Sequence, residues 1–204
     1  MKYAYAALLC AALLAAAPVR AEDANDDATA VQDINPRYVL VDSRGRTISN
    51  EDFPGRFQLI TFGYTYCPDI CPTTLATMTL VLGQLGEQAA RLQPIFISVD
   101  PERDSAAVIA RYTNYFDARI IGLSGSPQLV RGAADHFKVS YQKYAEPGAA
   151  PGSYSVDHST GIYLLGPDGN FVTKFAHATP ASEIAARIAT IMATSASPRA
   201  GARR

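Results

Sequence analysis

Apolar residues along the chain follow two periods that predict alternating strands and helices. Continuous apolar runs predict buried strands, at residues 57–63, 94–100, 120–123, 160–165 and 171–175. Apolar residues at every third or fourth position predict helices, at residues 72–85, 105–115, 127–137 and from 180 onward. A hairpin is expected over residues 38–48, with its turn at 43–45. This alternation predicts an α/β domain with a mixed central sheet flanked by helices, preceded by an N-terminal hairpin.

Two residues mark expected helix starts. Pro72 suits the first position of its helix, where the missing N–H costs nothing. Asp104 is expected at the N-cap of the next helix.

The two ends of the chain lack this pattern. Residues 1–21 combine Lys2, an uncharged Ala- and Leu-rich run and a small-residue site at 19–21, which is typical of a cleaved secretory signal peptide. The run is shorter than the roughly 20 residues that span a bilayer, so cleavage is favoured over a membrane anchor, and export to the periplasm is expected. We therefore divide the chain into a signal peptide (1–21), a flexible leader (22–35), one domain (36–194) and a disordered basic tail (195–204).

Composition narrows the classes of function. The 204 residues are 48% hydrophobic and 18% charged, which allows one domain with a sizeable core. The net charge of −1 gives no reason to expect nucleic acid as a partner.

Cys67 and Cys71 carry the main chemical signal. They remain as an even pair once Cys10 leaves with the signal peptide, and in an exported protein such a pair oxidises unless it is reduced or metal-bound. They lie where a predicted strand gives way to a helix, which is the arrangement of a thioredoxin-like fold. The helix N-terminus favours thiolate, which is both a nucleophile and a metal ligand. Three residues separate the cysteines where efficient dithiol exchange motifs usually have two, so redox chemistry, metal binding or both stay open.

A third ligand would come from histidine, and the chain offers three. His158 lies just before a strand that should run beside the cysteine loop, whereas His136 and His177 have no such placement. Two thiolates and one imidazole form a soft set that suits copper. Structural zinc normally takes four protein ligands, and haem attachment needs a Cys-x-x-Cys-His motif that is absent from the sequence.

Four motifs in order resemble the Sco/SenC family of copper chaperones. They are Cys67-Pro68-Asp69-Ile70-Cys71-Pro72, Asp100-Pro101-Glu102-Arg103-Asp104, Val156-Asp157-His158 and Gly166-Pro167-Asp168-Gly169. The resemblance runs from about Tyr38 to Met192.

The resemblance implies a thioredoxin-like fold and binding of Cu(I) or Cu(II) through Cys67, Cys71 and His158. It also implies delivery of copper to the binuclear copper centre of cytochrome c oxidase, or reduction of the thiols there. The implied partners are the copper-site subunit of the oxidase and, in addition, other copper carriers or thiol reductants. A carrier rather than an enzyme is therefore expected. Many family members are held to the membrane by an N-terminal helix, and the cleavable signal expected here departs from that pattern.

Three acidic residues are candidates for supporting the site. Asp100 and Asp104 match the family's paired acidic motif, although a turn and a helix cap explain them at least as well as direct metal binding does. Asp157 is a candidate to orient the imidazole of His158, or is an ordinary loop residue.

Two other functions would use the same cysteines. An exported thiol–disulfide oxidoreductase or redox sensor would use the Cys67–Cys71 disulfide and would not need His158 as a ligand. A peroxiredoxin-like peroxidase would need threonine three positions before the reactive cysteine, where this chain has Tyr64.

Overall fold

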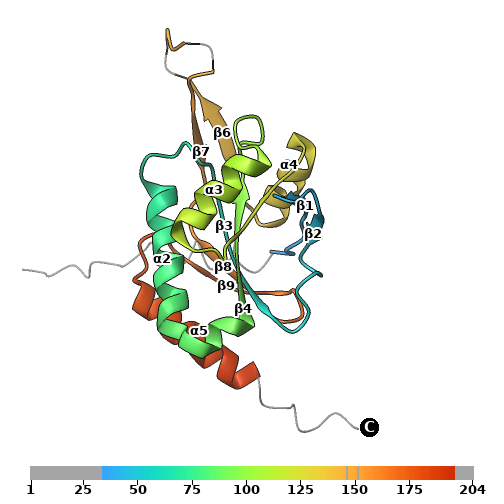
Figure 1. Cartoon of the computed structure of the whole chain (residues 1–204), viewed down its shortest axis with the longest axis vertical. Coiled ribbons are helices and arrows are strands. Elements are labelled where there is room, and N and C mark those ends of the chain that lie inside the picture. The colour runs from blue at the N-terminus through green and yellow to red at the C-terminus, as the bar shows by residue number, and fades with distance from the viewer. Residues whose placement is uncertain (1–33, 146, 151, 196–204) are drawn as a thin grey trace, which may run out of the picture.

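A seven-stranded mixed sheet forms the centre of the computed structural model, which describes residues 34–145, 147–150 and 152–195. The strand order is β2-β1-β5-β4-β3-β8-β9. Their bounds are β1 Val39–Asp42, β2 Thr47–Ser49, β3 Phe57–Gly63, β4 Leu92–Ser98, β5 Ile121–Ser124, β8 Ile162–Leu165 and β9 Phe171–Phe175. The expected mixed sheet and N-terminal hairpin are confirmed (Figure 1).

The three inner strands β5, β4 and β3 are parallel, and the strands on either side pair antiparallel. Strand β3 is buried along its whole length and aligns residue by residue with β4. Burial on both faces explains why both strands read as nearly continuous apolar runs. The loops that follow β3 and β4 consequently leave the sheet at the same edge.

Helices cover both faces of the sheet. Their bounds are α2 Ile70–Leu85, α3 Ala106–Phe116, α4 Pro127–His136 and α5 Ala181–Ser195, with the short 3₁₀ helix η1 at Gly86–Arg91. One core cluster joins the sheet to α4, and the other joins it to α2, α3 and α5. Alternate residues of β3 divide between the clusters, with Ile60 and Phe62 in the first and Phe57 and Leu59 in the second. This is the period of two that a strand buried on both faces requires.

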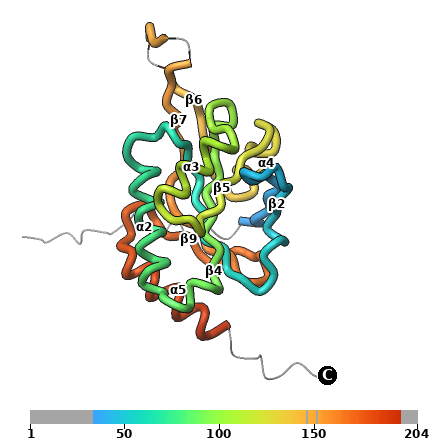
Figure 2. The backbone as a smooth tube through the Cα atoms, in the orientation of Figure 1, coloured from blue at the N-terminus to red at the C-terminus, as the bar shows by residue number. Residues whose placement is uncertain are grey.

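A second, two-stranded sheet was not predicted. Strands β6 (Tyr141–Tyr144) and β7 (Ser155–His158) pair only with each other and project beyond the main body (Figures 1 and 2). Only Val156 of these eight residues is fully buried. A hairpin that buries so little apolar surface leaves no hydrophobic pattern, so the sequence predicts no strand here.

Two predicted helix starts are wrong. Helix α2 begins at Ile70, so Pro72 occupies its third position, where the N–H still needs no partner within the helix. Ser105, and not Asp104, caps α3, because its side chain accepts a hydrogen bond from the Val108 N–H. Asp104 is committed to other partners, described below.

The predicted signal peptide, the leader as far as residue 33 and the tail from residue 196 lie outside the described residues. Ser195, which was expected to open the tail, is the last residue of α5. Across the residues that are described, no helix is both long and apolar enough to cross a membrane.

Candidate metal centre

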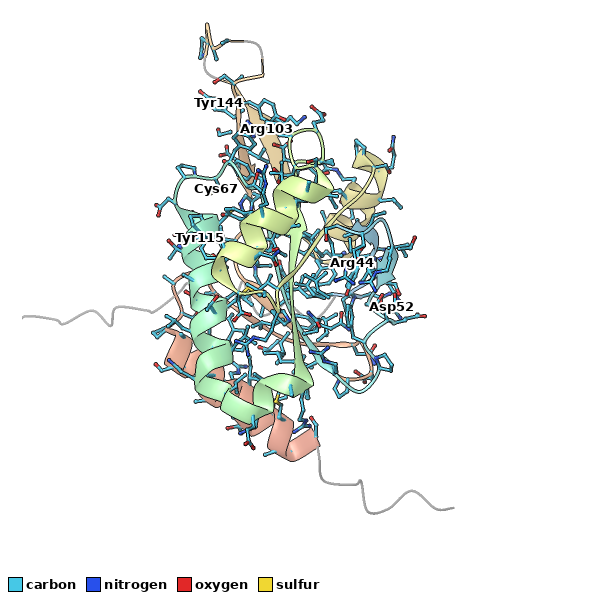
Figure 3. The ribbon with its side chains drawn as sticks, in the orientation of Figure 1. Arg44, Asp52, Cys67, Arg103, Tyr115 and Tyr144 are labelled. Carbon is cyan, nitrogen blue, oxygen red and sulfur yellow. The ribbon has the colours of Figure 1, made fainter. Side chains whose placement is uncertain are left out.

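The two cysteines lie at the edge of the sheet where β3 ends. Cys67 belongs to the loop after β3, and Cys71 is the second residue of α2. Cys71 is buried with 3% of its surface exposed, whereas Cys67 is partly exposed, and both are free thiols. Figure 3 shows Cys67 at the end of α2 that faces the β6–β7 hairpin.

The start of α2 stabilises the Cys67 thiolate. Asp69 stands at the N-cap but makes no side-chain capping bond, which leaves free N–H groups in the first turn. Burial raises the pKa of the Cys67 thiol, but hydrogen bonds from the backbone of Cys71, Asp69 and Ile70 and from the Cys71 thiol outweigh it. The pKa of Cys67 is therefore lowered.

Cys71 has the opposite electrostatic environment. Burial is the largest cause that raises its pKa, and the negative charges of Cys67 and Asp104 add to it. The pKa of Cys67 is thus lowered and that of Cys71 raised, so Cys67 is the first of the two thiols to lose its proton.

Gly63 makes room for the buried thiol. A Cβ at this position would lie 2.7 Å from Cys71 Sγ and 2.9 Å from Phe96 Cε2. The close approach of backbone to sulfur thus requires glycine. Sequence analysis missed this role, because nothing local distinguishes Gly63 from a glycine in a turn.

His158 approaches from the end of β7. Its Nε2 lies 3.6 Å from Cys71 Sγ, although the two residues are 87 positions apart. Its Nδ1 lies 3.0 Å from the Ser159 carbonyl oxygen, and the buried Tyr64 ring packs edge-on with ring centroids 6.0 Å apart. Burial lowers the pKa of His158, which favours the neutral imidazole that binds metals.

The predicted ligands are brought together only in part. Cys71 contacts His158, and Cys67 is hydrogen-bonded to Cys71. Among the described residues, however, no group of three or more His, Cys, Asp or Glu side chains is arranged to hold a metal ion. The arrangement thus holds the three donors near one another without a closed coordination shell. His136 and His177 are exposed, and neither has a contact with the thiols.

Asp100 and Asp104 are buried and already engaged. Asp104 accepts hydrogen bonds from the Ser98 hydroxyl at 2.6 Å, and from both the hydroxyl and the backbone N–H of Thr65. Burial raises the pKa of Asp104 despite these bonds. Asp100 pairs with Arg103 and accepts a hydrogen bond from the Tyr154 hydroxyl at 2.7 Å. Both carboxylates thus support the cysteine loop and the hairpin, and their place around a metal stays a prediction.

The supporting role of Asp157 stays a prediction. Asp157 is exposed, and the Ser159 carbonyl rather than the Asp157 carboxylate lies beside the His158 Nδ1. The negative charge of Asp157 raises the pKa of His158, but burial lowers that pKa by more.

Arg103 and Tyr154 also join the site, and sequence analysis did not single them out. The Arg103 guanidinium lies 3.6 Å from the Tyr154 ring centroid and 4.9 Å from that of Tyr66. The sequence offered one indication for Arg103, which lies between two acidic residues of the same motif. The sequence offered no such indication for Tyr154, because its partners come from a loop that is distant in the sequence.

The fold and the site define a class of protein: a thioredoxin-like domain with a thiol pair at the first parallel strand and a histidine placed against it. A family model described as SCO1/SenC matches residues 26–193. The chain therefore belongs to the SCO1/SenC family.

Individual relatives and solved structures support membership of this family. The chain is 42% identical over 149 residues to the mitochondrial SCO2 homolog of Bos taurus, covering 72% of this chain and 55% of that protein. A structure of Bradyrhizobium japonicum ScoI with copper bound is 37% identical with a TM-score of 0.70, covering 77% of this chain and 98% of that one. BsSco, described as having a disulfide switch and as a member of the Sco family of cytochrome c oxidase assembly proteins, is 25% identical with a TM-score of 0.58, covering 76% and 90%. The chain spans about half the length of the mammalian SCO2 relatives it matches.

Proposed function

We propose that this protein is a copper-binding metallochaperone for the assembly of cytochrome c oxidase. It delivers copper to the binuclear copper site of the oxidase, or reduces the thiols of that site before copper arrives. The copper-site subunit of the oxidase is the proposed partner. Copper is cargo in this proposal, and the protein acts as a carrier.

The contact between Cys71 and His158 carries the proposal. A separation of 3.6 Å between Sγ and Nε2 allows both atoms to bind one ion after a small shift. Cys67, hydrogen-bonded to Cys71, would complete the set by turning its thiolate toward the same point. Thiolates favour Cu(I), and a neutral imidazole binds either oxidation state of copper.

The incomplete shell fits a carrier. A metal bound by three donors from two separate segments, the start of α2 with the loop before it and the end of β7, can be released when a partner's ligands replace them one at a time. The relatives with copper bound support copper as the ion, and the description of BsSco supports oxidase assembly as the setting.

A redox role is the second candidate, and the unequal thiols favour it. Cys67, partly exposed and with a lowered pKa, is suited to attack a disulfide of a target, and the buried Cys71 is suited to resolve the mixed disulfide. The two thiols then become a disulfide, and the target gains two electrons and two protons. An exported thiol–disulfide reductase or redox sensor would work in this way.

The proposal also includes the cell compartment and the chain organisation. We propose export through a cleaved signal peptide at residues 1–21, followed by a leader to 35, and function in the periplasm. N-terminal sequencing of the secreted protein tests this proposal, and an N-terminus that retains residues 1–21 would contradict it.

Titration of the reduced protein with Cu(I) against a competing chelator tests the copper site. We expect one Cu(I) per chain, with the affinity reduced by on the order of 10- to 100-fold or more in His158→Ala. Cys67→Ser and Cys71→Ser should abolish binding at the same chelator concentration.

His136→Ala is the matched control, because it removes an exposed histidine outside the site. Its affinity should equal that of the unaltered protein. Failure of the unaltered protein to bind copper would refute the copper role, and disulfide reduction that survives in His158→Ala would then favour the redox role.

A further inference from the structure

The β6–β7 hairpin brings His158 to the site, yet the main sheet does not hold it. Its strands pair only with each other, so no ladder of backbone hydrogen bonds fixes its direction. Burial of Val156 anchors one point of the hairpin in the core. Tyr141 and Tyr154 pack against the same core but stay partly exposed. Because so little apolar surface is buried, polar side-chain contacts also set the angle of the hairpin.

Arg103 supplies such contacts at the end of the hairpin that adjoins its connecting loop, where Tyr154 directly precedes β7. Its Nη1 donates to the Tyr154 carbonyl oxygen at 2.8 Å, and its guanidinium stacks on the Tyr154 ring at 3.6 Å. Its Nε donates to Asp100, which in turn accepts from the Tyr154 hydroxyl. We call Arg103, Asp100 and Tyr154 the Arg103 clamp.

The same guanidinium also touches the cysteine loop. The Tyr66 ring centroid lies 4.9 Å from Arg103 Cζ, and that of Tyr64 lies 5.7 Å away. Tyr64 in turn packs against the His158 ring. Arg103 therefore lies between the loop that carries Cys67 and the hairpin that carries His158, as Figure 3 shows for the labelled Arg103 and Cys67.

Burial makes these contacts strong. The Asp100 side chain is fully buried and that of Arg103 is 17% exposed, so water competes poorly for the ion pair. A second pair, Lys143 with Glu102 at 2.6 Å, joins β6 to the same loop but is exposed, and it adds little. Arg103 Nη2 is also buried, and it has no hydrogen-bond partner in the described residues.

We propose that Arg103 is a positioning residue that sets the distance between His158 and the two thiols. The clamp ties the start of β7 to the cysteine loop, and without it the hairpin tilts and withdraws the imidazole from Cys71. This inference rests on the proposed copper site for its consequence, but the clamp itself can be tested without copper.

Hydrogen exchange of the reduced, metal-free protein tests the clamp directly. In Arg103→Met, amides of Tyr141–Tyr144 and Ser155–His158 should exchange faster by on the order of tenfold, with β3 and β4 unchanged. Arg187→Met is the control, because it removes the same charge from α5, where Arg187 lies over the Phe175 ring. Arg103→Lys keeps the charge but cannot span Asp100 and Tyr154 together, so it should behave like Arg103→Met.

Unchanged hairpin exchange in Arg103→Met would overturn the inference, as would full protection in Arg103→Lys, which would assign the effect to charge alone. Because Arg103→Met leaves Asp100 buried without its cation, that variant can fail to fold. Tyr154→Leu is the second variant: it keeps the ion pair and removes the ring and hydroxyl, and it should loosen the hairpin in the same way.

Copper affinity then tests the consequence. Arg103→Met should weaken Cu(I) binding by on the order of 10- to 100-fold. In a His158→Ala background the same substitution should have no further effect, because the imidazole it positions is gone. Equal losses in both backgrounds would overturn the positioning role. Absence of copper binding in the unaltered protein would refute the proposed function instead, and the exchange experiment would still decide the clamp.

Discussion

Cys67 and Cys71 are the same side chain placed in two opposite environments. Helix N–H groups lower the pKa of Cys67, and burial raises that of Cys71. Although only four positions separate them, Cys67 is therefore the more reactive thiol and Cys71 the less reactive one. The difference in pKa follows from exposure and hydrogen bonding. The local sequence cannot cause it, because both cysteines lie in the same short segment.

Alkylation should distinguish the two thiols. In the reduced, metal-free protein, iodoacetamide should modify Cys67 at least about tenfold faster than Cys71, because only the exposed thiolate reacts. The Cys67 rate should level off at a pH below the usual thiol pKa of about 8.5. Peptide mapping by mass spectrometry measures both rates, with Cys67→Ser and Cys71→Ser assigning the signals. Faster modification of Cys71 would contradict this account.

Gly63 is the second residue whose environment decides its identity. Gly63→Ala would force a methyl group against Cys71 Sγ and Phe96, and should lower the free energy of unfolding by about 1–3 kcal/mol. Gly83→Ala is the matched control within α2, since a Cβ there meets nothing within 4 Å. It should be neutral or stabilising by up to about 1 kcal/mol. Urea unfolding measures both, and a stable Gly63→Ala protein would show that the thiol can move.

Among the elements, the N-terminal hairpin shows how a turn is held by one carboxylate. Asp42 accepts hydrogen bonds from the Arg44 and Arg46 N–H groups, both at 2.9 Å, and pairs with the Arg46 guanidinium at 2.7 Å. Burial raises the pKa of Asp42, but the contacts with Arg46 and Arg44 outweigh it, so the pKa is lowered.

A lowered pKa in the folded state means that the ionised form stabilises the fold. The contribution of Asp42 is present above the unfolded pKa of about 3.9 and is lost as the pH falls through the lower folded value. Asp42→Asn should therefore reduce the free energy of unfolding by roughly 1–3 kcal/mol at pH 7 and by much less near pH 2. Urea unfolding at both pH values measures the difference. An equal loss at both would exclude the carboxylate charge as the cause.

The two hairpins differ in what holds them. Strand β1 is paired with β5, so the N-terminal hairpin belongs to the main sheet, and its apolar alternation made it predictable. The β6–β7 hairpin contacts the body through Val156, through partly buried tyrosines and through Arg103, and its exposed strands carry no such alternation. The element that matters most for the site was therefore the one with the weakest local signal.

At the scale of the whole molecule, the site joins three loops from one edge of the sheet. Thr65 and Asp104 connect the loops after β3 and β4, and the Arg103 clamp connects the second of these to the hairpin. Redox state and copper loading act on the same pair of thiols. A disulfide between Cys67 and Cys71 would remove two of the three donors at once.

Copper should therefore stabilise only the reduced form of the protein and not the oxidised form. With free Cu(I) at 100 times the dissociation constant, linkage predicts about 2.7 kcal/mol of added stability, measured as a rise in the thermal unfolding midpoint. The oxidised protein should show no rise, and neither should reduced Cys71→Ser. A rise of equal size in the oxidised protein would place copper elsewhere.

The sequence by itself determined the strands of the main sheet, the four α-helices to within a few residues, and the choice of Cys67, Cys71 and His158 as candidate ligands. These predictions rest on the local spacing of apolar residues and on residue chemistry, and both can be read directly from the sequence. The end of β3 at Gly63 and the span of β9 could be read in this way to the residue.

Only the tertiary structure decided how the site is built. The hydrogen bonds of Asp104 to Thr65 cross 39 positions, Arg103 reaches Tyr154 across 51, and Cys71 meets His158 across 87. Asp104 looked like a helix cap because a local rule fitted it, and a distant partner competed successfully for the same carboxylate. The pKa difference between the thiols has the same origin, since burial and hydrogen bonding exist only once the loops are packed together.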